Sequence, residues 1–393
     1  MFIDLMRAMS FQPNVVVKNA RLVLPDRVVE DGSVVIDSGL IASIDSQELT
    51  PIANAVDLSG MTVLPGFIDV HIHGAVGVDV MEASADGLKK VSAYLATQGV
   101  TGWLATLVPG SDENYASVST AVGESMKGSG GARVLGIHYE GPFVNSAQCG
   151  ALHTEYFKTY SNPKDLDALP VPEHSVRMTT MAPEVGGGVE LVRELKKRGW
   201  VISIGHTRAG LEVLDDAAAA GAHHMTHFMN AMAPLHHRTP GPIAWGLLRD
   251  DVTFDLIADG VHLDPFMLRL VLKIKGADGI TLISDAIAAA GKGDGDYQIW
   301  GETISVKNGR TANAAGSIAG SVISILDAVQ LLHSLGVSYT ELARMASSNP
   351  AKLLGIDKDC GTIEVGKRAD LVALDQQGNV KLTLVGGEIV YSS

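Results

Sequence analysis

Eight short apolar runs recur along the middle of the chain, and each of them ends in polar residues. Segments with the helical spacing of apolar residues lie between several of these runs, for example over 85–99 and 186–199. Strands that alternate with helices predict parallel β/α units, and eight such units over about 290 residues predict an α/β protein with a (β/α)8 TIM barrel. The predicted strands lie at 62–73, 101–109, 133–142, 177–184, 200–207, 222–230, 252–260 and 280–287.

The two ends of the chain have a different pattern. Alternating Val or Ile and polar residues, interrupted by Asp-Gly and Ser-Gly, run through the first sixty residues and return after residue 360. This pattern predicts antiparallel strands. We therefore expect one small β domain built from residues 1–62 and 358–393, with the barrel over 63–357. Within the barrel segment, residues 296–321 are expected to form a hairpin insertion, and residues 321–336 and 338–355 are expected to form the terminal helices.

Composition and charge narrow the functional classes. The 393 residues are 46% hydrophobic and carry a formal net charge of −14, which argues against a general nucleic-acid or membrane-surface role. Cys149 and Cys360 are the only cysteines, so a disulfide framework is excluded and a reducing compartment is expected. No apolar run approaches the roughly 18 residues of a membrane span, and the first twelve residues lack the pattern of a signal peptide. These features predict a soluble cytoplasmic protein.

Candidate chemistry lies where the predicted strands end. In PGFIDVHIHG (65–74), His71 and His73 are two residues apart, so on a strand both imidazoles point to the same side and can reach one metal ion. Two histidines that hydrogen-bond the backbone at the barrel rim are the alternative. The carboxyl ends of barrel strands open onto one face, where residues far apart in sequence converge.

Three further strand ends carry metal-ligand types. Glu140 ends an apolar run in which a carboxylate is costly unless it is paired or coordinated, and His206 and His227 end two later runs. A structural ion pair and two core histidines are the alternatives when each residue is taken singly. Together, one carboxylate and two imidazoles form a typical catalytic metal set that leaves a position open for water.

Two other features fit catalysis and anion binding. Asp285 follows the eighth predicted strand, where a carboxylate can move protons beside a metal-activated water, although Asp is also a favoured helix N-cap. Asp259 and His262 end the seventh predicted strand in the same way. Arg238, in the loop PLHHRTPGP, suits bidentate binding of phosphate or carboxylate, and an exposed loop arginine is the equal alternative.

At this point the sequence resembles a known family. The motifs PGFIDVHIHG, HYEGPF, GHT, THFMNAM, ADGVH, SDA and IAGS occur in the order found in N-acetylglucosamine-6-phosphate deacetylases of the amidohydrolase superfamily, followed by GTIEVGKRADLVALD near the end. The resemblance covers nearly the whole chain. It implies that the small domain is a β-sandwich and that the enzyme is a homodimer. The implied reaction is metal-dependent hydrolysis of the acetamide of N-acetylglucosamine-6-phosphate to glucosamine-6-phosphate and acetate.

The resemblance also implies roles for individual residues. Glu140, His206 and His227 would bind the principal metal, and Asp285 would act as general base and then acid. Substrate would be contacted by Asn230 and Ala231, by Ile318, Ala319 and Gly320, and by Ala151 and His153 of the stretch CGALH. One residue more than in the family's KGAH-like stretch leaves the alignment of His153 open. Arg238 and His262 would bind the sugar phosphate, with Arg238 reaching into the neighbouring subunit's site.

The number of metal ions and the substrate are the least constrained expectations. Some family members lack the H-x-H pair and use one metal ion, whereas this chain keeps His71 and His73, so a second ion bridged by Glu140 is expected as an option. Zinc is the first expectation, with Fe, Mn, Co or Cd as alternatives, because imidazole and carboxylate suit several ions. Deacetylation of another N-acetyl amino-sugar phosphate, such as N-acetylgalactosamine-6-phosphate, and cyclic-amide hydrolysis are the competing activities. A catalytically inactive binding or assembly protein is the alternative from a different class.

Overall fold

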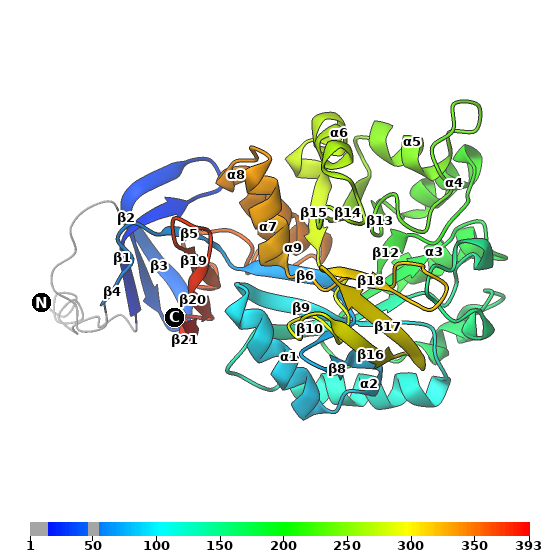
Figure 1. The fold of residues 1–393 in the computed structure, drawn as a ribbon, viewed down its shortest axis with the longest axis horizontal. Helices are drawn as coiled ribbons and strands as arrows, with labels where there is room; N and C mark the ends of the chain where they lie inside the picture. Colours follow the sequence, from blue (N-terminus) through cyan, green and yellow to red (C-terminus); the bar gives the residue numbers. More distant parts are fainter. Residues whose placement is uncertain (1–14, 46–54) are drawn as a thin grey trace, which may run out of the picture.

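Eight parallel strands form the central sheet of the computed structural model, which describes residues 15–45 and 55–393 (Figure 1). All eight predicted strands are present, and each hydrogen-bonds to the next, so the predicted (β/α)8 barrel is confirmed. A parallel bridge between Ile72 and Ala286 and a 2.9 Å hydrogen bond from the Asp285 N–H to the His71 carbonyl join the first strand to the last. The strands are β6 (Phe67–Ile72), β9 (Val100–Leu107), β10 (Arg133–Glu140), β11 (Val176–Met181), β12 (Val201–Ile204), β13 (His224–Met225), β14 (Thr253–Ile257) and β15 (Ile280–Ile283).

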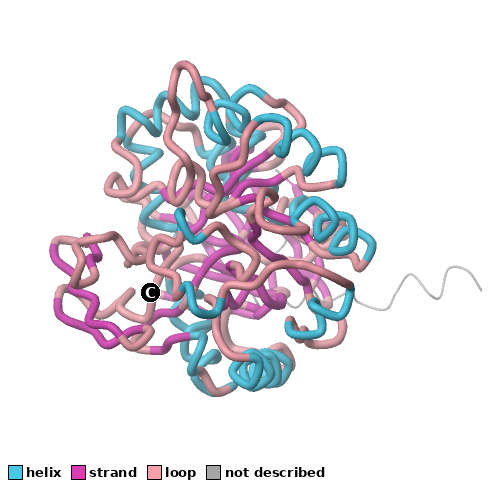
Figure 2. Tube along the Cα trace, turned by 90° about the vertical axis from the view of Figure 1, so that its right-hand side faces the viewer, coloured by secondary structure: helices cyan, strands magenta, loops and turns pink. Residues whose placement is uncertain are grey.

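Helices cover the outside of this barrel (Figure 2). In the first of them, Ser84 caps the N-terminus by accepting from the Gly87 N–H, and Leu88, Val91 and Leu95 bury one face against the sheet. The α-helices are α1 (Ala85–Thr97), α2 (Asp112–Ser125), α3 (Gly188–Lys197), α4 (Leu211–Ala220), α5 (Gly241–Leu248), α6 (Pro265–Lys275), α7 (Ile325–Ser334), α8 (Tyr339–Ala343) and α9 (Asn349–Leu353). The short 3-10 helices are η2 (Val80–Glu82), η3 (Ser146–Gln148), η4 (Thr154–Tyr156), η5 (Pro163–Ala168) and η6 (Ala277–Gly279). The predicted helix over 338–355 is present as α8 and α9, joined by the π-helical turn η7 (Arg344–Ser348).

A second sheet contains strands from both ends of the chain, as the sequence pattern predicts (Figure 1). Its strand order is β21-β20-β19-β5-β1-β2-β3, with β4 paired to β1. The described strands are β1 (Val15–Val23), β2 (Val28–Asp37), β3 (Leu40–Asp45), β4 (Ala55–Asp57), β5 (Thr62–Pro65), β19 (Leu371–Leu374), β20 (Val380–Val385) and β21 (Glu388–Ser392). Val17, Leu22, Ile36 and Leu371 form part of its core, so the two chain ends share one apolar interior. This is the β-sandwich domain.

The passage between the two domains is short. β5 continues the terminal sheet to Pro65, past the expected boundary at residues 62 and 63, and the barrel begins with Phe67. The domain boundaries expected from the sequence stay predictions. The N-terminal part expected for the small β domain, residues 1–62, includes residues 1–14 and 46–54, which lie outside the described residues.

An antiparallel insertion follows β15, as predicted. It consists of β16 (Gly295–Ile299), β17 (Glu302–Lys307) and β18 (Arg310–Ala312). Ile299, Ile304 and Val306 pack it against the buried residues Ile287 and Ala289, which follow β15. The turn between β16 and β17 therefore has a fixed position relative to the barrel. Among the described residues, no helix combines the length and the apolar character needed to cross a membrane.

The barrel interior has an apolar layer below the carboxyl ends of its strands. Val70, Leu104, Met178, Ile257 and Ile283 come from five different strands and belong to one buried cluster. Strands alternate the direction of their side chains, so a strand that fills this layer can still present a polar residue at its end. The packing of the lower barrel thus fixes where the strand ends converge.

Candidate metal centre and active site

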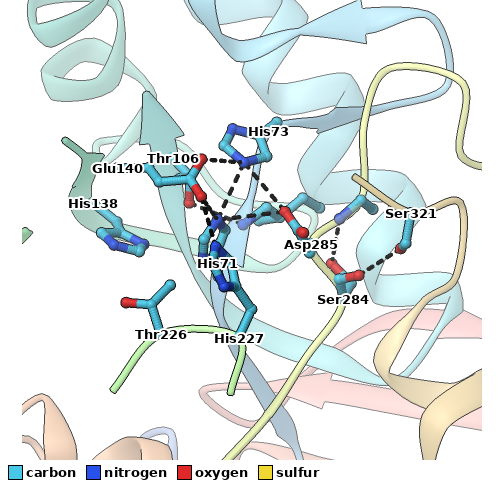
Figure 3. Close-up of polar contacts among 12 residues, drawn as sticks. His71, His73, Thr106, His138, Glu140, Thr226, His227, Ser284, Asp285 and Ser321 are labelled. Carbon is cyan, nitrogen blue, oxygen red and sulfur yellow. Dashed lines mark hydrogen bonds and ion pairs between the residues drawn. The ribbon is translucent and has the colours of Figure 1, made fainter. Parts of the chain in front are cut away.

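Six titratable side chains meet at the carboxyl ends of the barrel strands. Each one ends a strand or follows it by a few residues, and none is more than 7% exposed. Figure 3 shows five of them pointing toward one another, with His71 and His73 from the end of one strand and Glu140, His227 and Asp285 from the ends of three others. They form two groups in which the ligand atoms lie within 4.8 Å of one another, and each group could hold a metal ion. The first group is Glu140, His206 and His227, and the second is His71, His73 and Asp285.

Glu140 lies between the two groups. Its Oε1 is 2.9 Å from His206 Nε2 and 2.9 Å from His227 Nε2. Its Oε2 is 3.3 Å from His73 Nε2, so the two oxygens of one carboxylate face different groups. This geometry suits a carboxylate that bridges two adjacent cations.

The second group is equally tight. Asp285 Oδ1 lies 3.2 Å from His73 Nε2 and 3.4 Å from His71 Nε2, and the two Nε2 atoms are 3.1 Å apart. The predicted same-side arrangement of the H-x-H pair is therefore present. His71 is the fully buried member of this group. Its ring also packs edge-on against the His138 ring, with the two centroids 4.6 Å apart.

The backbone bends sharply at three of the six residues. His206, His227 and Asp285 have φ angles of 47°, 27° and 51°, in the left-handed region that residues other than glycine rarely adopt. Each such residue costs on the order of 1–3 kcal/mol and persists only where the surroundings hold it in place. Three of them at three strand ends mean that these side chains are aimed into the cluster at the expense of backbone strain.

The donor atoms of the first group fit a cation. His206 Nδ1 donates to the Gln148 carbonyl at 2.7 Å, and His227 Nδ1 donates to the Asn230 carbonyl at 3.2 Å. Because a carbonyl only accepts, both Nδ1 atoms carry protons, and Nε2 in a neutral imidazole then carries a lone pair. These two Nε2 atoms lie 3.1 Å apart beside a carboxylate oxygen, so positive charge from protons or a metal ion is needed to hold them together. Backbone contacts of this kind orient metal-ligating histidines in general.

The pKa shifts have the same electrostatic origin. Burial raises the pKa of Glu140, but the charge interaction with His71 and the close contacts with His206 and His227 outweigh it and hold that pKa well below the ordinary value. Burial lowers the pKa of His73, but hydrogen bonds to Asp285 and Glu140 raise it to about 10. Two carboxylates thus draw positive charge to this point. A divalent cation would compete there with protons, so metal binding should release protons.

A cavity of about 360 Å³ opens onto the cluster. Gly320 has a φ of 57°, and a Cβ there would lie 2.9 Å from the Asp285 carbonyl oxygen and 2.6 Å from Ile287 Cγ2, so only glycine fits beside Asp285. His262 is held by Asp259, whose Oδ2 lies 2.7 Å from His262 Nδ1. The predicted site residues that line the cavity are His73, Glu140, Ala151, His206, His227, Asn230, Ala231, His262, Asp285, Ile318 and Gly320.

Four predicted site residues do not line the cavity. His71 and Ala319 are fully buried behind it. His153 turns toward the β16–β17 hairpin, where its Nε2 donates to the Trp300 carbonyl at 3.0 Å. Arg238 is exposed in its loop, and its guanidinium donates to His237 Nε2 at 2.6 Å. The functional assignments of all the site residues stay predictions.

Several residues that line the cavity were not predicted from the sequence. Trp300 lines the cavity from the tip of the β16–β17 hairpin, and Gly150, Leu152 and Ser317 complete the wall. The hairpin itself was predicted, but no local signal indicates that its tip reaches the strand ends of the barrel. The contact depends on the packing of the insertion.

Comparison with known proteins agrees with this geometry. The pattern of the amidohydrolase family matches residues 62–390. N-acetylglucosamine-6-phosphate deacetylase of Bacillus subtilis is 36% identical over 395 residues, which cover 97% of this chain and 98% of that protein. N-acetylgalactosamine-6-phosphate deacetylase of Escherichia coli O157:H7 is 34% identical, covering 95% of this chain and 98% of that protein.

Solved structures give the same result. The crystal structure of N-acetylglucosamine-6-phosphate deacetylase from Thermotoga maritima superposes with a TM-score of 0.88 at 36% identity, covering 96% of this chain and 100% of that chain. Its likeness therefore includes both the barrel and the β-sandwich. The chain belongs to the amidohydrolase family, within the branch of the N-acetylglucosamine-6-phosphate deacetylases.

Proposed function

We propose that this protein hydrolyses the acetamide of N-acetylglucosamine-6-phosphate to give glucosamine-6-phosphate and acetate. The observation that carries the proposal is the position of Glu140, with one oxygen toward His206 and His227 and the other toward His73. This cluster forms the floor of a cavity that also contains Asp285 and His262. The similarity of the chain to N-acetylglucosamine-6-phosphate deacetylases supports the choice of N-acetylglucosamine-6-phosphate as substrate.

Glu140, His206 and His227 would hold the principal metal ion. His71 and His73 would hold a second ion together with Asp285, and Glu140 would bridge the two. A divalent cation bound there supplies Lewis acidity, which lowers the pKa of water and polarises a carbonyl oxygen. Zinc remains the first expectation, because three N and O ligands with an open position are typical of catalytic zinc.

Asp285 would move the proton. It lies against the cluster at the cavity floor, where an attacking water must stand to reach the acetamide carbon. As a carboxylate it accepts the proton of that water while the C–O bond forms. It then returns this proton to the sugar nitrogen as the C–N bond breaks, so the amine leaves and the acyl group leaves as acetic acid, which ionises to acetate by giving its proton to the solvent or to the amine.

The substrate would lie with its sugar along the cavity wall. Asn230, Ala231, Ala151 and the stretch Ile318–Gly320 line that wall. His262, oriented by Asp259, would bind the phosphate with Nε2, the ring nitrogen that is not bonded to Asp259. Arg238 and His153 belong to the same proposal as phosphate- and carbonyl-binding groups that must move into the cavity or into a neighbouring subunit's cavity to act.

The homodimer is part of the proposal, and one surface supports it. Phe266, Leu270 and Ile274 are spaced four residues apart on α6 and are exposed, as is Leu248 at the end of α5. A stripe of this spacing suits packing against a second helix. Size-exclusion chromatography with light scattering should show a dimer, and Phe266→Asp should shift it toward monomer. The cytoplasmic location stays a prediction.

Acetate release tests the proposed function. The protein, stripped with chelator and reloaded separately with Zn²⁺, Fe²⁺ or Mn²⁺, is incubated with N-acetylglucosamine-6-phosphate, and free acetate and primary amine are measured. We expect equimolar acetate and amine, and much less turnover with unphosphorylated N-acetylglucosamine. Metal analysis of the loaded protein counts one or two ions per chain. No acetate with any of the metals would refute the proposal.

N-acetylgalactosamine-6-phosphate is the second candidate substrate, because a relative of nearly full length carries that activity in its name. The two sugars differ only in the configuration of one hydroxyl group, so the fold does not decide between them. The ratio of kcat/KM for the two phosphorylated sugars, measured side by side, decides which is preferred.

A further inference from the structure

Trp300 occupies a turn that is unfavourable for it. The β16–β17 hairpin pairs Ile299 with Glu302, so Trp300 and Gly301 form a two-residue loop with φ angles of 54° and 75°. Two-residue loops with positive φ at both positions favour Asn-Gly, because bulky side chains strain the left-handed conformation. A tryptophan at the first position therefore needs a reason outside the hairpin.

The surroundings of Trp300 supply that reason. Its ring lies edge-on to the His73 ring, with centroids 5.2 Å apart and planes at 85°, and it lines the cavity. Its carbonyl accepts the hydrogen bond from His153 Nε2, and the base of the hairpin is packed against Ile287 and Ala289. Contacts on both sides of the turn thus hold the Trp300 indole against the His73 ring.

The lining of the cavity is mixed in character. His262 and Asn230 are polar, whereas Leu152, Ile318 and most of the Trp300 indole are apolar. In the proposed reaction the acyl carbon must stand beside Asp285, and Asp285 Oδ1 lies 3.2 Å from the imidazole against which Trp300 packs. An alkyl group on that acyl carbon is then within reach of the indole that packs against His73.

We propose that Trp300 determines acyl-group specificity: its indole forms the wall that accepts the methyl of an N-acetyl group and limits the length of the acyl chain. The inference rests on the proposed deacetylase function and adds a residue to it. Trp300 contacts substrate but moves no proton, so its replacement should change the choice among acyl groups more than the chemistry.

The test compares acyl chains on one sugar. N-formyl, N-acetyl, N-propionyl and N-butyryl glucosamine-6-phosphate are assayed for release of primary amine, and kcat/KM is measured for each with wild type, Trp300→Ala, Trp300→Asn and Trp300→Phe. Trp300→Asn places the favoured residue in the turn, so the hairpin should keep its fold, which a thermal melt checks. Gln298→Ala, on the exposed face of the same hairpin, is the matched control.

We expect Trp300→Ala and Trp300→Asn to raise the propionyl-to-acetyl ratio of kcat/KM about tenfold or more, since one methylene in an apolar pocket changes discrimination by about 10- to 200-fold. Trp300→Phe should fall between these variants and wild type, and Gln298→Ala should match wild type. An equal loss on all four substrates would mean that the indole contacts the sugar and would overturn the inference. An unchanged ratio would also overturn it, whereas wild type that releases no amine from the N-acetyl compound would overturn the proposed function as well.

Discussion

Asp259→Asn tests the proposal that His262 binds the substrate phosphate. Asp259 Oδ2 accepts from His262 Nδ1 at 2.7 Å, and its Oδ1 accepts from the Val261 and His262 N–H groups at 2.8 and 2.7 Å. Burial raises the pKa of Asp259, but its hydrogen bond and charge interaction with His262 outweigh that effect and hold the pKa below its ordinary value. The carboxylate therefore stays ionised and fixes the ring so that Nε2 is the nitrogen left for substrate.

The magnitude follows from the type of bond that is lost. An amide in place of the carboxylate keeps an acceptor for the backbone but replaces a buried charge-assisted bond with a neutral one, at a cost of about 1–2 kcal/mol. In a binding constant this is roughly five- to thirty-fold. Because the phosphate is remote from the reacting carbonyl, the loss should be in uniform binding, with a higher KM and nearly the same kcat.

Steady-state acetate release on phosphorylated and unphosphorylated N-acetylglucosamine measures this effect. The rise in KM should occur with the phosphorylated sugar and be absent with the unphosphorylated one. Asp264→Asn is the matched control, since Asp264 caps α6 by accepting from the Phe266 N–H at 2.7 Å and does not line the cavity. A variant with wild-type KM for the phosphorylated sugar, or with equal losses on both sugars, would refute the assignment of His262 to the phosphate.

Three further changes test the catalytic cluster. Asp285→Asn should keep the fold and the metal of the first group but lose about 10²- to 10⁴-fold in kcat, as expected for a general acid–base group; acetate release and metal analysis check this, and near-normal turnover would contradict it. Glu140→Gln should lower the metal content of both groups, because its two oxygens face His206 and His73, and full occupancy by elemental analysis would count against the ligand set. Burial raises the pKa of Asp69 to about 6, so the folded chain binds a proton at this carboxylate more tightly than the unfolded chain does. The free energy of unfolding therefore falls as pH rises toward and through 6. Metal-free protein should gain about 1.4 kcal/mol from this group between pH 7.5 and pH 5, and denaturant titration should show that Asp69→Asn lacks this gain.

The local pattern of the sequence determines the barrel and most of the titratable residues that cluster at its strand ends. Apolar runs that end in His, Glu or Asp predict strands with polar carboxyl ends, and the barrel topology brings those ends together without any knowledge of side-chain contacts. His71, His73, Glu140 and Asp285 are found where this argument expects them. The antiparallel pattern at both chain ends likewise predicts a shared sheet, which β5 and β19 form.

Contacts between distant segments decide the rest. The orientation of Glu140 toward two groups depends on where β10 lies between its neighbours. The position of Asp285 depends on its N–H hydrogen bond to the His71 carbonyl, where the last barrel strand meets the first. His153 points at Trp300 rather than into the cavity because the hairpin packs on the residues after β15. Periodicity specifies which face of an element is buried, but it carries no information about which distant side chain will meet that face. The His, Glu and Asp residues that cluster at the strand ends could therefore be found from the sequence, whereas Trp300, the residue that we infer selects the acyl group, became visible only in the tertiary structure.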